Sequence, residues 1–349
     1  MTNAPDLSPR EAMERWLKRR RQDVRESTLS SLHYRLKLFV EWCEERDIDA
    51  MADLDGWVVD DYQLSRSHAA AVTLEKELGS VKQWLEYCQT IGLVSEDVPA
   101  AINPPSTDPR ERVDETKLAP KDGEALLEYY RTTPSVHGSR AHAVVEIFWT
   151  TGCRVGALVA LDVGDVDLEG NALEFHHRPD TGTPLKNGVE SERDLGIREE
   201  TVAALRAWSN RDGPFATDEY GRKPFFPTHN GRPIRNTVRN WCYEATLPCH
   251  HTKCPHGKAR ETCGWTSITQ ATRCPSSRSP HQLRTDSLTW QRSRGVPAEV
   301  VSDRADASVR TVNRHYDQED RRRELEERRR DHLDKLDLDD DPQEDGSND

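Results

Sequence analysis

Apolar side chains recur at helical spacing through the first hundred residues. From residue 27 onward, six of them fall on one face of a helix: Leu29, Leu32, Leu36, Phe39, Val40 and Cys43. Ser8-Pro-Arg-Glu combines an N-cap, a first-turn proline and an early acid, which predicts a helix over residues 8–21. Further helices are predicted over 57–64 and 73–91. We therefore expect a helical domain over residues 8–100, preceded by a flexible terminus at 1–7.

The pattern changes after residue 100. Residues 101–116 are rich in proline and short polar side chains, which predicts a linker between two domains. Residues 117–331 are expected to form the larger domain, with short strands at 173–176 and 193–197. Helices are predicted in this domain at 121–132, 141–151, 155–161, 199–208, 236–245, 281–294 and 298–305. The predicted fold class is mainly α with a small β-sheet.

Charged residues dominate the chain beyond residue 316. Glu324 precedes Arg328 by four residues, and Glu326 stands in the same relation to Arg330, a spacing that favours an exposed helix. The sequence leaves open whether this helix is solvated or docks on a neighbouring protomer. Residues 332–349 are mostly acidic and polar, so we expect an acidic disordered tail there.

The net charge of −13 argues at first sight against a nucleic-acid partner, because an acidic field repels phosphates. Residues 334–349 alone carry eight Asp or Glu and one Lys, however, so the rest of the chain is only mildly acidic. Arginine outnumbers lysine by 38 to 11, and with the abundant Asp this balance is typical of salt-loving archaea. At about 1 M salt the Debye length is only ~3 Å, so short bidentate arginine contacts can still bind DNA.

The sequence also predicts a compartment. No apolar run approaches the ~20 residues that span a bilayer, and the N-terminus lacks the apolar core of a signal peptide. We therefore expect a cytoplasmic protein without a membrane partner. In that reducing compartment the eight cysteines are not expected to pair as disulfides.

Four side chains suited to phosphodiester chemistry occur along the larger domain. Arg154 follows Thr-Thr-Gly-Cys, His281 and Arg284 form a His-x-x-Arg pair, and Tyr316 lies 32 residues beyond Arg284. Two guanidinium groups can neutralise the non-bridging oxygens of a phosphate as it becomes five-coordinate. Their charge also favours the phenolate of a tyrosine, whose pKa is normally about 10. A phosphotyrosyl ester stores the energy of the broken diester, so rejoining the strand requires no ATP.

With these residues in this order and spacing, the chain resembles the tyrosine recombinase, or phage integrase, family, and its composition suits the haloarchaeal integrase-like members. The resemblance implies that Arg154, His281 and Arg284 act on the scissile phosphate and that Tyr316 is the nucleophile. It also implies a lysine on a β-hairpin that protonates the leaving 5′-hydroxyl. Lys186, between the predicted strands, is the best candidate because Arg178 comes too early. The alternative interpretation of Lys186 is an exposed turn residue.

The resemblance further implies how such a protein works. It implies a site-specific DNA recombinase or integrase that cuts and rejoins strands through a 3′-phosphotyrosyl intermediate. Residues 8–100 would form a SAM-like helical DNA clamp, and 117–331 the catalytic domain. Double-stranded DNA and a homo-tetramer on two DNA sites are the implied partners, and no cofactor is implied for catalysis.

Two positions depart from the pattern of the family. The family usually has an acidic residue three positions after the first arginine, where this chain has Ala157. It usually has a second His or Trp nine residues before the tyrosine, where this chain has Ala307. Partial substitutes for the second residue remain open between Asp303, Arg304 and His315. The departures motivate an alternative function, a catalytically impaired recombinase relic that binds DNA as a regulator.

Residues 247–275 form a Cys/His-rich insertion that carries too few apolar side chains to build a core of its own. A tetrahedral metal ion would organise such a segment, and this number of Cys and His residues suggests structural zinc. The spacing matches no common zinc finger, so a reduced, metal-free segment is the alternative. A zinc-braced adaptor is accordingly a third functional hypothesis. The predicted ligands are Cys249, Cys254, Cys263 and Cys274, with His256 as the competing fourth ligand.

Overall fold

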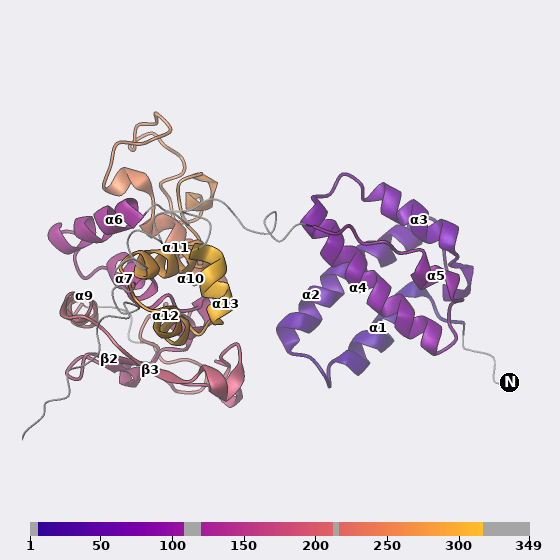
Figure 1. Ribbon diagram of the computed structural model, residues 1–349, viewed down its shortest axis with the longest axis horizontal. Helices are drawn as coiled ribbons and strands as arrows, with labels where there is room; N and C mark the ends of the chain where they lie inside the picture. Colours follow the sequence, from indigo (N-terminus) through magenta and orange to yellow (C-terminus); the bar gives the residue numbers. More distant parts are fainter. Residues whose placement is uncertain (1–5, 108–119, 212–215, 317–349) are drawn as a thin grey trace, which may run out of the picture. The chain divides into compact units, whose positions relative to one another are not determined.

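The computed structural model describes residues 6–107, 120–211 and 216–316 (Figure 1). The chain divides into two compact units, one within residues 1–115 and one within 116–349. Helices dominate both units, and the described part of the second adds a three-stranded antiparallel sheet. The predicted fold class, mainly α with a small β-sheet, is thereby confirmed. Within these described ranges, no helix is long and apolar enough to cross a lipid bilayer.

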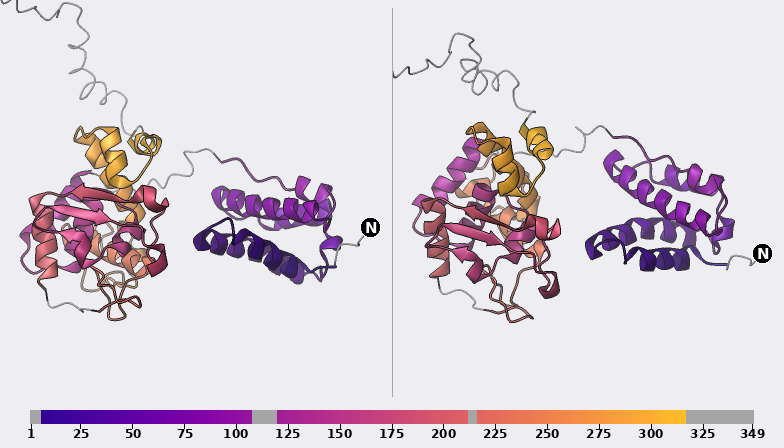
Figure 2. Two further views of the ribbon diagram at one scale, coloured as in Figure 1. Left: turned by 90° about the horizontal axis from the view of Figure 1, so that it is seen from below. Right: turned by 60° about the horizontal axis from the view of Figure 1, so that its bottom comes forward.

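The first unit is a bundle of helices around an apolar core. Ser8 begins the bundle with a capping box, in which its hydroxyl accepts a hydrogen bond from the Glu11 amide and the Glu11 carboxylate accepts one from the Ser8 amide. Figure 2 shows the long fourth helix beside the first two. The helices are α1 (Pro9–Arg20), α2 (Glu26–Glu44), α3 (Gly56–Ser65), α4 (Ala71–Thr90) and the short α5 (Asp97–Ala100).

The second unit is built around α7 (Arg140–Thr151), which is buried along almost its whole length. Its run of apolar side chains leaves no solvated face, as expected for a helix enclosed by others. Helices α6, α9, α10 and α11 pack around it. The bounds of the remaining helices are α6 (Pro120–Thr132), α8 (Val155–Ala160), α9 (Glu199–Ser209), α10 (Arg235–Ala245), α11 (Pro280–Ser293), α12 (Ala298–Ala305) and α13 (Val309–Tyr316).

The sheet of the second unit has the order β1-β2-β3. Strand β2 (Ala172–Phe175) pairs antiparallel with β1 (Val166–Asp167) and with β3 (Arg193–Gly196). Leu173 lies opposite Leu195, and both are buried, so one face of the sheet covers the core. The connection from β2 to β3 carries the short 3-10 turns η3 (Pro179–Thr181) and η4 (Gly188–Ser191).

The core of the first unit contains a buried carboxylate. Glu77 on α4 accepts a hydrogen bond from the Tyr62 hydroxyl at 2.5 Å and two from the Arg66 guanidinium at 2.8 and 3.0 Å. Burial and the neighbouring Glu77 charge both raise the pKa of Tyr62 above its usual value. Because both oxygens of Glu77 are paired, the charge is tolerated where it lies.

We predict that Glu77→Ala destabilises the first unit by about 3 kcal/mol, because it leaves the Tyr62 hydroxyl and Arg66 without their partner. Hydrogen exchange over residues 56–90, measured by mass spectrometry on the full chain, reports this loss. Glu86→Ala is the matched control, since Glu86 is an exposed residue of the same helix. We expect the control to change stability by less than about 0.5 kcal/mol, and equal effects of the two variants would contradict the interpretation.

Candidate active site

Arg154 is positioned by the abrupt end of α7. Gly152 ends that helix with φ of 61°, in the left-handed region that glycine adopts without strain. A Cβ atom at this position would lie 2.7 Å from the Leu288 side chain, so the close packing also requires glycine. The turn delivers Arg154 to the N-cap position of α8, where its side chain is one-quarter exposed and donates a hydrogen bond to the Asp306 carboxylate.

Arg284 reaches the same place from α11. A capping box between Ser279 and Gln282 begins this helix, and Pro280 occupies its first turn. The buried Arg284 guanidinium donates from Nη1 to the carbonyls of Gly152, at 2.8 Å, and Ala305. Burial lowers the pKa of Arg284 to about 10, and the positive charge of Arg154 acts in the same direction.

The two arginines predicted from sequence therefore converge, although 130 residues separate them in the chain. Asp306 links them, because its side chain accepts from Arg154 and its carbonyl oxygen accepts from Nη2 of Arg284 at 3.3 Å. The Arg284 guanidinium is positively charged at neutral pH, since its pKa of about 10 lies well above neutrality, and Asp306 holds the guanidinium of Arg154 beside it. The place where they meet is suited to a bound anion.

His281 lies three residues before Arg284, in the first turn of α11, and its side chain is exposed. Residues at this spacing are neighbours on the surface of a helix, so the imidazole and the guanidinium belong to one face. The backbone of Tyr316 forms the last residue of α13, which packs against α11 and α12 through the buried Val312. The phenol of Tyr316 lies outside the described side chains.

Lys186 lies on the connection between β2 and β3, where its side chain is exposed. The residues that follow it are bound to Asp306: Asn187 donates from Nδ2 to Oδ1 at 3.0 Å, and the Ser191 hydroxyl donates to Oδ2 at 2.6 Å. The segment that carries Lys186 is thus attached to the same carboxylate as Arg154. This attachment places the backbone next to Lys186 beside Asp306.

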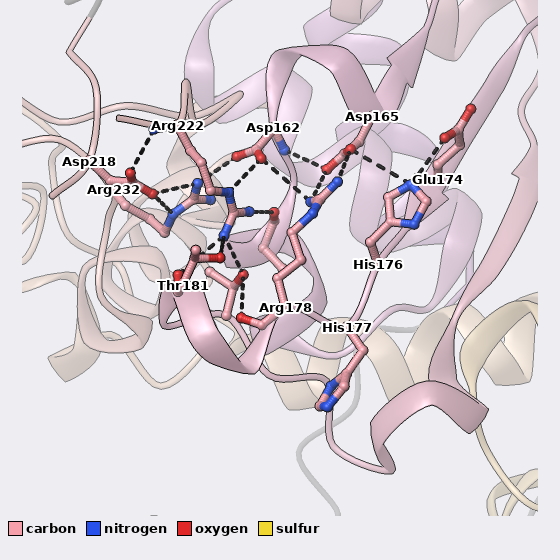
Figure 3. Close-up of polar contacts among 12 residues, drawn as sticks. Asp162, Asp165, Glu174, His176, His177, Arg178, Thr181, Asp218, Arg222 and Arg232 are labelled. Carbon is pink, nitrogen blue, oxygen red and sulfur yellow. Dashed lines mark hydrogen bonds and ion pairs between the residues drawn. The ribbon is translucent and has the colours of Figure 1, made fainter. Parts of the chain in front are cut away.

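The other end of the same connection is held by an ion-pair network (Figure 3). Both Nη atoms of Arg178 donate to the buried Asp165, at 2.7 and 2.6 Å. Arg222 donates to Asp162 at 2.8 Å and to the hydroxyl of Thr181 at 2.7 Å. Arg178 therefore has a structural role that fixes the β-hairpin on which Lys186 lies.

Sequence reasoning missed two residues of this region, Arg193 and Asp306. Arg193, in β3, stacks over the Phe175 ring and donates to the carbonyls of Arg304 at 3.0 Å and Ser191 at 2.9 Å. Burial lowers its pKa. Neither residue belongs to a recognisable motif, and the only signal was the position of Asp306 directly before Ala307, where the chain departs from the family pattern. Ala307 itself packs against a small apolar cluster formed by Leu288, Ala298, Val301, Ala305 and Val312.

Zinc binding by Cys249, Cys254, His256, Cys263 and Cys274 stays a prediction. Throughout the described ranges, no group of three or more His, Cys, Asp or Glu residues is placed to hold a metal ion. Cys249 lies near enough to Cys254 and Cys274 for their charges to raise its pKa. Cys274 is buried against Leu247 and Ala271, whereas the His256 ring bonds the Ser276 hydroxyl at 3.0 Å.

Hydrogen bonds between side-chain hydroxyls and the main chain hold the insertion at its ends. The Thr246 hydroxyl accepts a hydrogen bond from the Arg278 amide at 2.7 Å and so joins the two ends of the insertion. The Ser277 hydroxyl donates to the carbonyls of Ala271 at 2.7 Å and Cys274 at 2.9 Å. The insertion ends directly before the Ser279 cap of α11, so these contacts support the start of the helix that bears His281 and Arg284.

Comparison with known proteins identifies similar sequences, although no family model matches the chain. A tyrosine recombinase XerC from Roseiflexus castenholzii is 30% identical over 152 residues, which are 42% of this chain and 46% of that protein. The XerC of Herpetosiphon aurantiacus is 28% identical over 144 residues, 41% of this chain and 46% of that protein. The chain spans about half the length of the curated relatives it matches.

Solved structures share the fold. The Tn1549 transposon integrase in complex with a circular intermediate DNA is 14% identical, with a TM-score of 0.64 and coverage of 95% of this chain and 100% of that one. A lambda integrase dimer bound to a COC′ core site is 12% identical, with a TM-score of 0.60 and coverage of 90% and 79%. The N-terminal domain of a phage integrase/site-specific recombinase from Haloarcula marismortui is 46% identical and covers 29% of this chain and 100% of its own, with a TM-score of 0.28.

The Asp165–Arg178 pair makes the stability of the second unit depend on pH. Burial alone would raise the pKa of Asp165, but the hydrogen bonds from Arg178 and the Asp162 amide, together with the charge of Arg178, outweigh it, so the pKa lies below the usual value. The carboxylate therefore stabilises the fold above about pH 4, the usual pKa of Asp, and this stabilisation is lost as the pH falls through the lower folded-state pKa.

We expect Asp165→Asn to lower the free energy of unfolding by about 2 kcal/mol at pH 7, and the difference from wild type to shrink below pH 4. Urea unfolding of both proteins at a series of pH values measures it. Asp194→Asn, which changes an exposed residue of β3, should match wild type at every pH. If wild type stayed more stable than Asp165→Asn by the same free energy of unfolding down to pH 2, the charge-based explanation would be contradicted.

Proposed function

The chain belongs to the tyrosine recombinase, or phage integrase, family, and on this premise we propose that it cuts and rejoins DNA strands at specific sites. The observation that carries the proposal is the convergence of Arg154 and Arg284 from distant segments on one place. A module that only binds DNA along its surface has no need of two guanidinium groups, one of them buried, at the same point. A phosphate that changes its charge during reaction does need them.

In the proposed reaction, the phenol of Tyr316 releases its proton to solvent, and the phenolate oxygen attacks the phosphorus of the scissile diester. The bond between phosphorus and the 5′-oxygen breaks, and the DNA remains attached to the protein through a 3′-phosphotyrosyl ester. The developing charge on the non-bridging oxygens is stabilised by Arg154 and Arg284, which are held before the substrate arrives and so require little reorganisation. Rejoining is the same exchange in reverse, with a 5′-hydroxyl as the attacking group.

Two other residues have proposed roles in proton transfer and phosphate binding. The exposed Lys186 ammonium protonates the 5′-oxygen as it leaves, which a long side chain on the β2–β3 connection can do by reaching into the site. The exposed His281, on the same helix as Arg284, donates a hydrogen bond to a phosphate oxygen. None of these steps uses a cofactor.

The proposed substrate is double-stranded DNA. Solved relatives of the same fold, the Tn1549 and lambda integrases, are complexes with DNA, and the lambda integrase is a dimer on its core site. We extend this to the present chain by proposing that the helices of the first unit and the second unit both contact the duplex, and that four protomers act on two sites.

A second function, a DNA-binding regulator without cleavage activity, is favoured by one observation. Position 157 carries a buried alanine where the family has an acid, so the usual partner of Arg154 is missing. A protein that has lost cleavage can keep its DNA affinity, because phosphate contacts along the duplex supply most of that affinity. The two functions differ in one measurable product, the covalent adduct.

We predict that the wild-type chain forms a covalent adduct with a nicked suicide duplex that carries its target site, and that Tyr316→Phe forms none. The phenylalanine lacks the attacking oxygen but keeps the ring, so DNA binding should persist. Denaturing gel electrophoresis detects the adduct. Tyr220→Phe, which removes the hydroxyl of a half-exposed tyrosine elsewhere in the unit, should react like wild type. Tight binding by the wild type with no adduct would favour the regulator.

Arg154→Ala and Arg284→Ala should each slow adduct formation by a factor on the order of 10²–10³, the effect of removing one preorganised donor from a transition state. The rate is measured in single turnover at saturating DNA, so that a change in affinity does not enter. Arg198→Ala, at a largely exposed arginine, is the control and should leave the rate unchanged. Equal rates for all three variants would exclude the proposed phosphate site.

A further inference from the structure

We propose that Asp306 is a positioning residue of this site, one that holds Arg154 and couples it to the segment of Lys186. The inference rests on the proposed function and adds to it a residue outside the motif from which that function was predicted. Asp306 follows α12 and lies far from Arg154 in sequence, so only the tertiary structure brings them together.

The first support is the number of segments that meet at this one residue. Its carboxylate accepts hydrogen bonds from Arg154, from the Asn187 amide at 3.0 Å and from the Ser191 hydroxyl at 2.6 Å. Its carbonyl oxygen accepts from Arg284 at 3.3 Å. Asp306 therefore contacts the start of α8, the β2–β3 connection and α11, the three segments that carry Arg154, Lys186 and Arg284.

The second support is electrostatic. Arg154, Arg193 and Arg284 lie close enough that the charge of Arg154 lowers the pKa of both Arg193 and Arg284, while Asp306 acts on both in the opposite direction. Like charges at this separation disfavour the folded arrangement unless an opposite charge is near. Of the described residues, Asp306 is the one carboxylate that forms an ion pair with Arg154. It thus supplies from another segment the negative charge that Ala157 cannot supply.

The third support is the way in which Asp306 is itself held. It has φ of 52°, in the left-handed region that Asp and Asn adopt more readily than most residues. The preceding Arg304 donates to the carbonyls of Gly196 at 3.1 Å and Thr150 at 3.0 Å, and Arg193 donates to the Arg304 carbonyl. The contacts of the neighbouring Arg304 thus hold this part of the chain in place before any substrate binds, as a positioning role requires.

The alternative role for the same carboxylate is that of an internal anion, which a DNA phosphate would have to displace from Arg154. The contacts favour positioning. The two carboxylate oxygens of Asp306 together accept hydrogen bonds from three donors. Arg154 donates to this carboxylate through Nη1. One quarter of the Arg154 side chain stays exposed, which leaves guanidinium N–H groups for a phosphate while the ion pair persists.

Asp306→Asn in the full chain tests the proposal. Asparagine keeps the size of the side chain, accepts hydrogen bonds and tolerates the left-handed backbone, so the change removes mainly the charge. We expect the single-turnover rate of adduct formation at saturating DNA to fall by roughly 10–100-fold, with DNA affinity within about twofold of wild type. Glu299→Gln is the matched control, since it removes one negative charge from an exposed residue of α12.

A second substrate distinguishes a positioning role of Asp306 from a general loss of structure in the variant. A 5′-bridging sulfur at the scissile phosphate leaves without protonation, so the reaction no longer depends on a general acid such as Lys186. Because Asp306 also holds the segment of Lys186, we expect the deficit of Asp306→Asn to shrink on this substrate without disappearing. A deficit of the same size on both substrates, together with a lowered unfolding midpoint, would indicate a merely structural residue and overturn the proposal.

The remaining outcomes are equally distinct. An Asp306→Asn variant as fast as wild type on ordinary DNA would overturn the proposal and leave the proposed function intact. An Asp306→Asn variant that forms the adduct faster than wild type would overturn the positioning role and would show that Asp306 competes with the DNA phosphate. Absence of the adduct from the wild type itself would overturn the proposed function, and the positioning role with it.

Discussion

The structure of the second unit depends on keeping three guanidinium groups together where little water reaches them. Arg154, Arg193 and Arg284 repel one another, and burial lowers the pKa of the last two. Main-chain carbonyls at the ends of α7, α12 and η4 accept hydrogen bonds from these groups, and a single carboxylate pairs with Arg154. Because those carbonyls belong to different elements, the arginines can be satisfied only when the elements meet as the fold requires.

The same principle recurs at buried carboxylates among the described residues. Glu77 in the first unit and Asp165 in the second each accept two or more hydrogen bonds from arginine side chains or other donors. Removal of one partner from such a group leaves a buried charge uncompensated, which destabilises more than loss of the whole pair. An arginine-rich, acidic composition therefore contributes to the interior as well as to the surface.

The helices were predictable because the chain carries them locally, through apolar residues at helical spacing and through caps such as Ser8 and Ser279. The prediction missed β1, which has two residues, and α13, whose buried Val312 acquires its partners only by packing on α11 and α12. In the Cys/His insertion, residue type and number suggested zinc, which stays a prediction. The hydrogen bonds and the small apolar cluster that hold the ends of the segment had no signature in its composition.

The sequence by itself determined which side chains are available for the proposed chemistry, since Arg154, His281, Arg284 and Tyr316 occur in an order and spacing that resemble those of the tyrosine recombinase family. It also determined that Arg284 and His281 share a helix, because their spacing is local. Only the tertiary structure decided that Asp306 is the partner of Arg154 and that the same carboxylate binds the segment of Lys186. An ion pair between residues far apart in the chain has no local signature, because it exists only when long-range packing brings its two charges together.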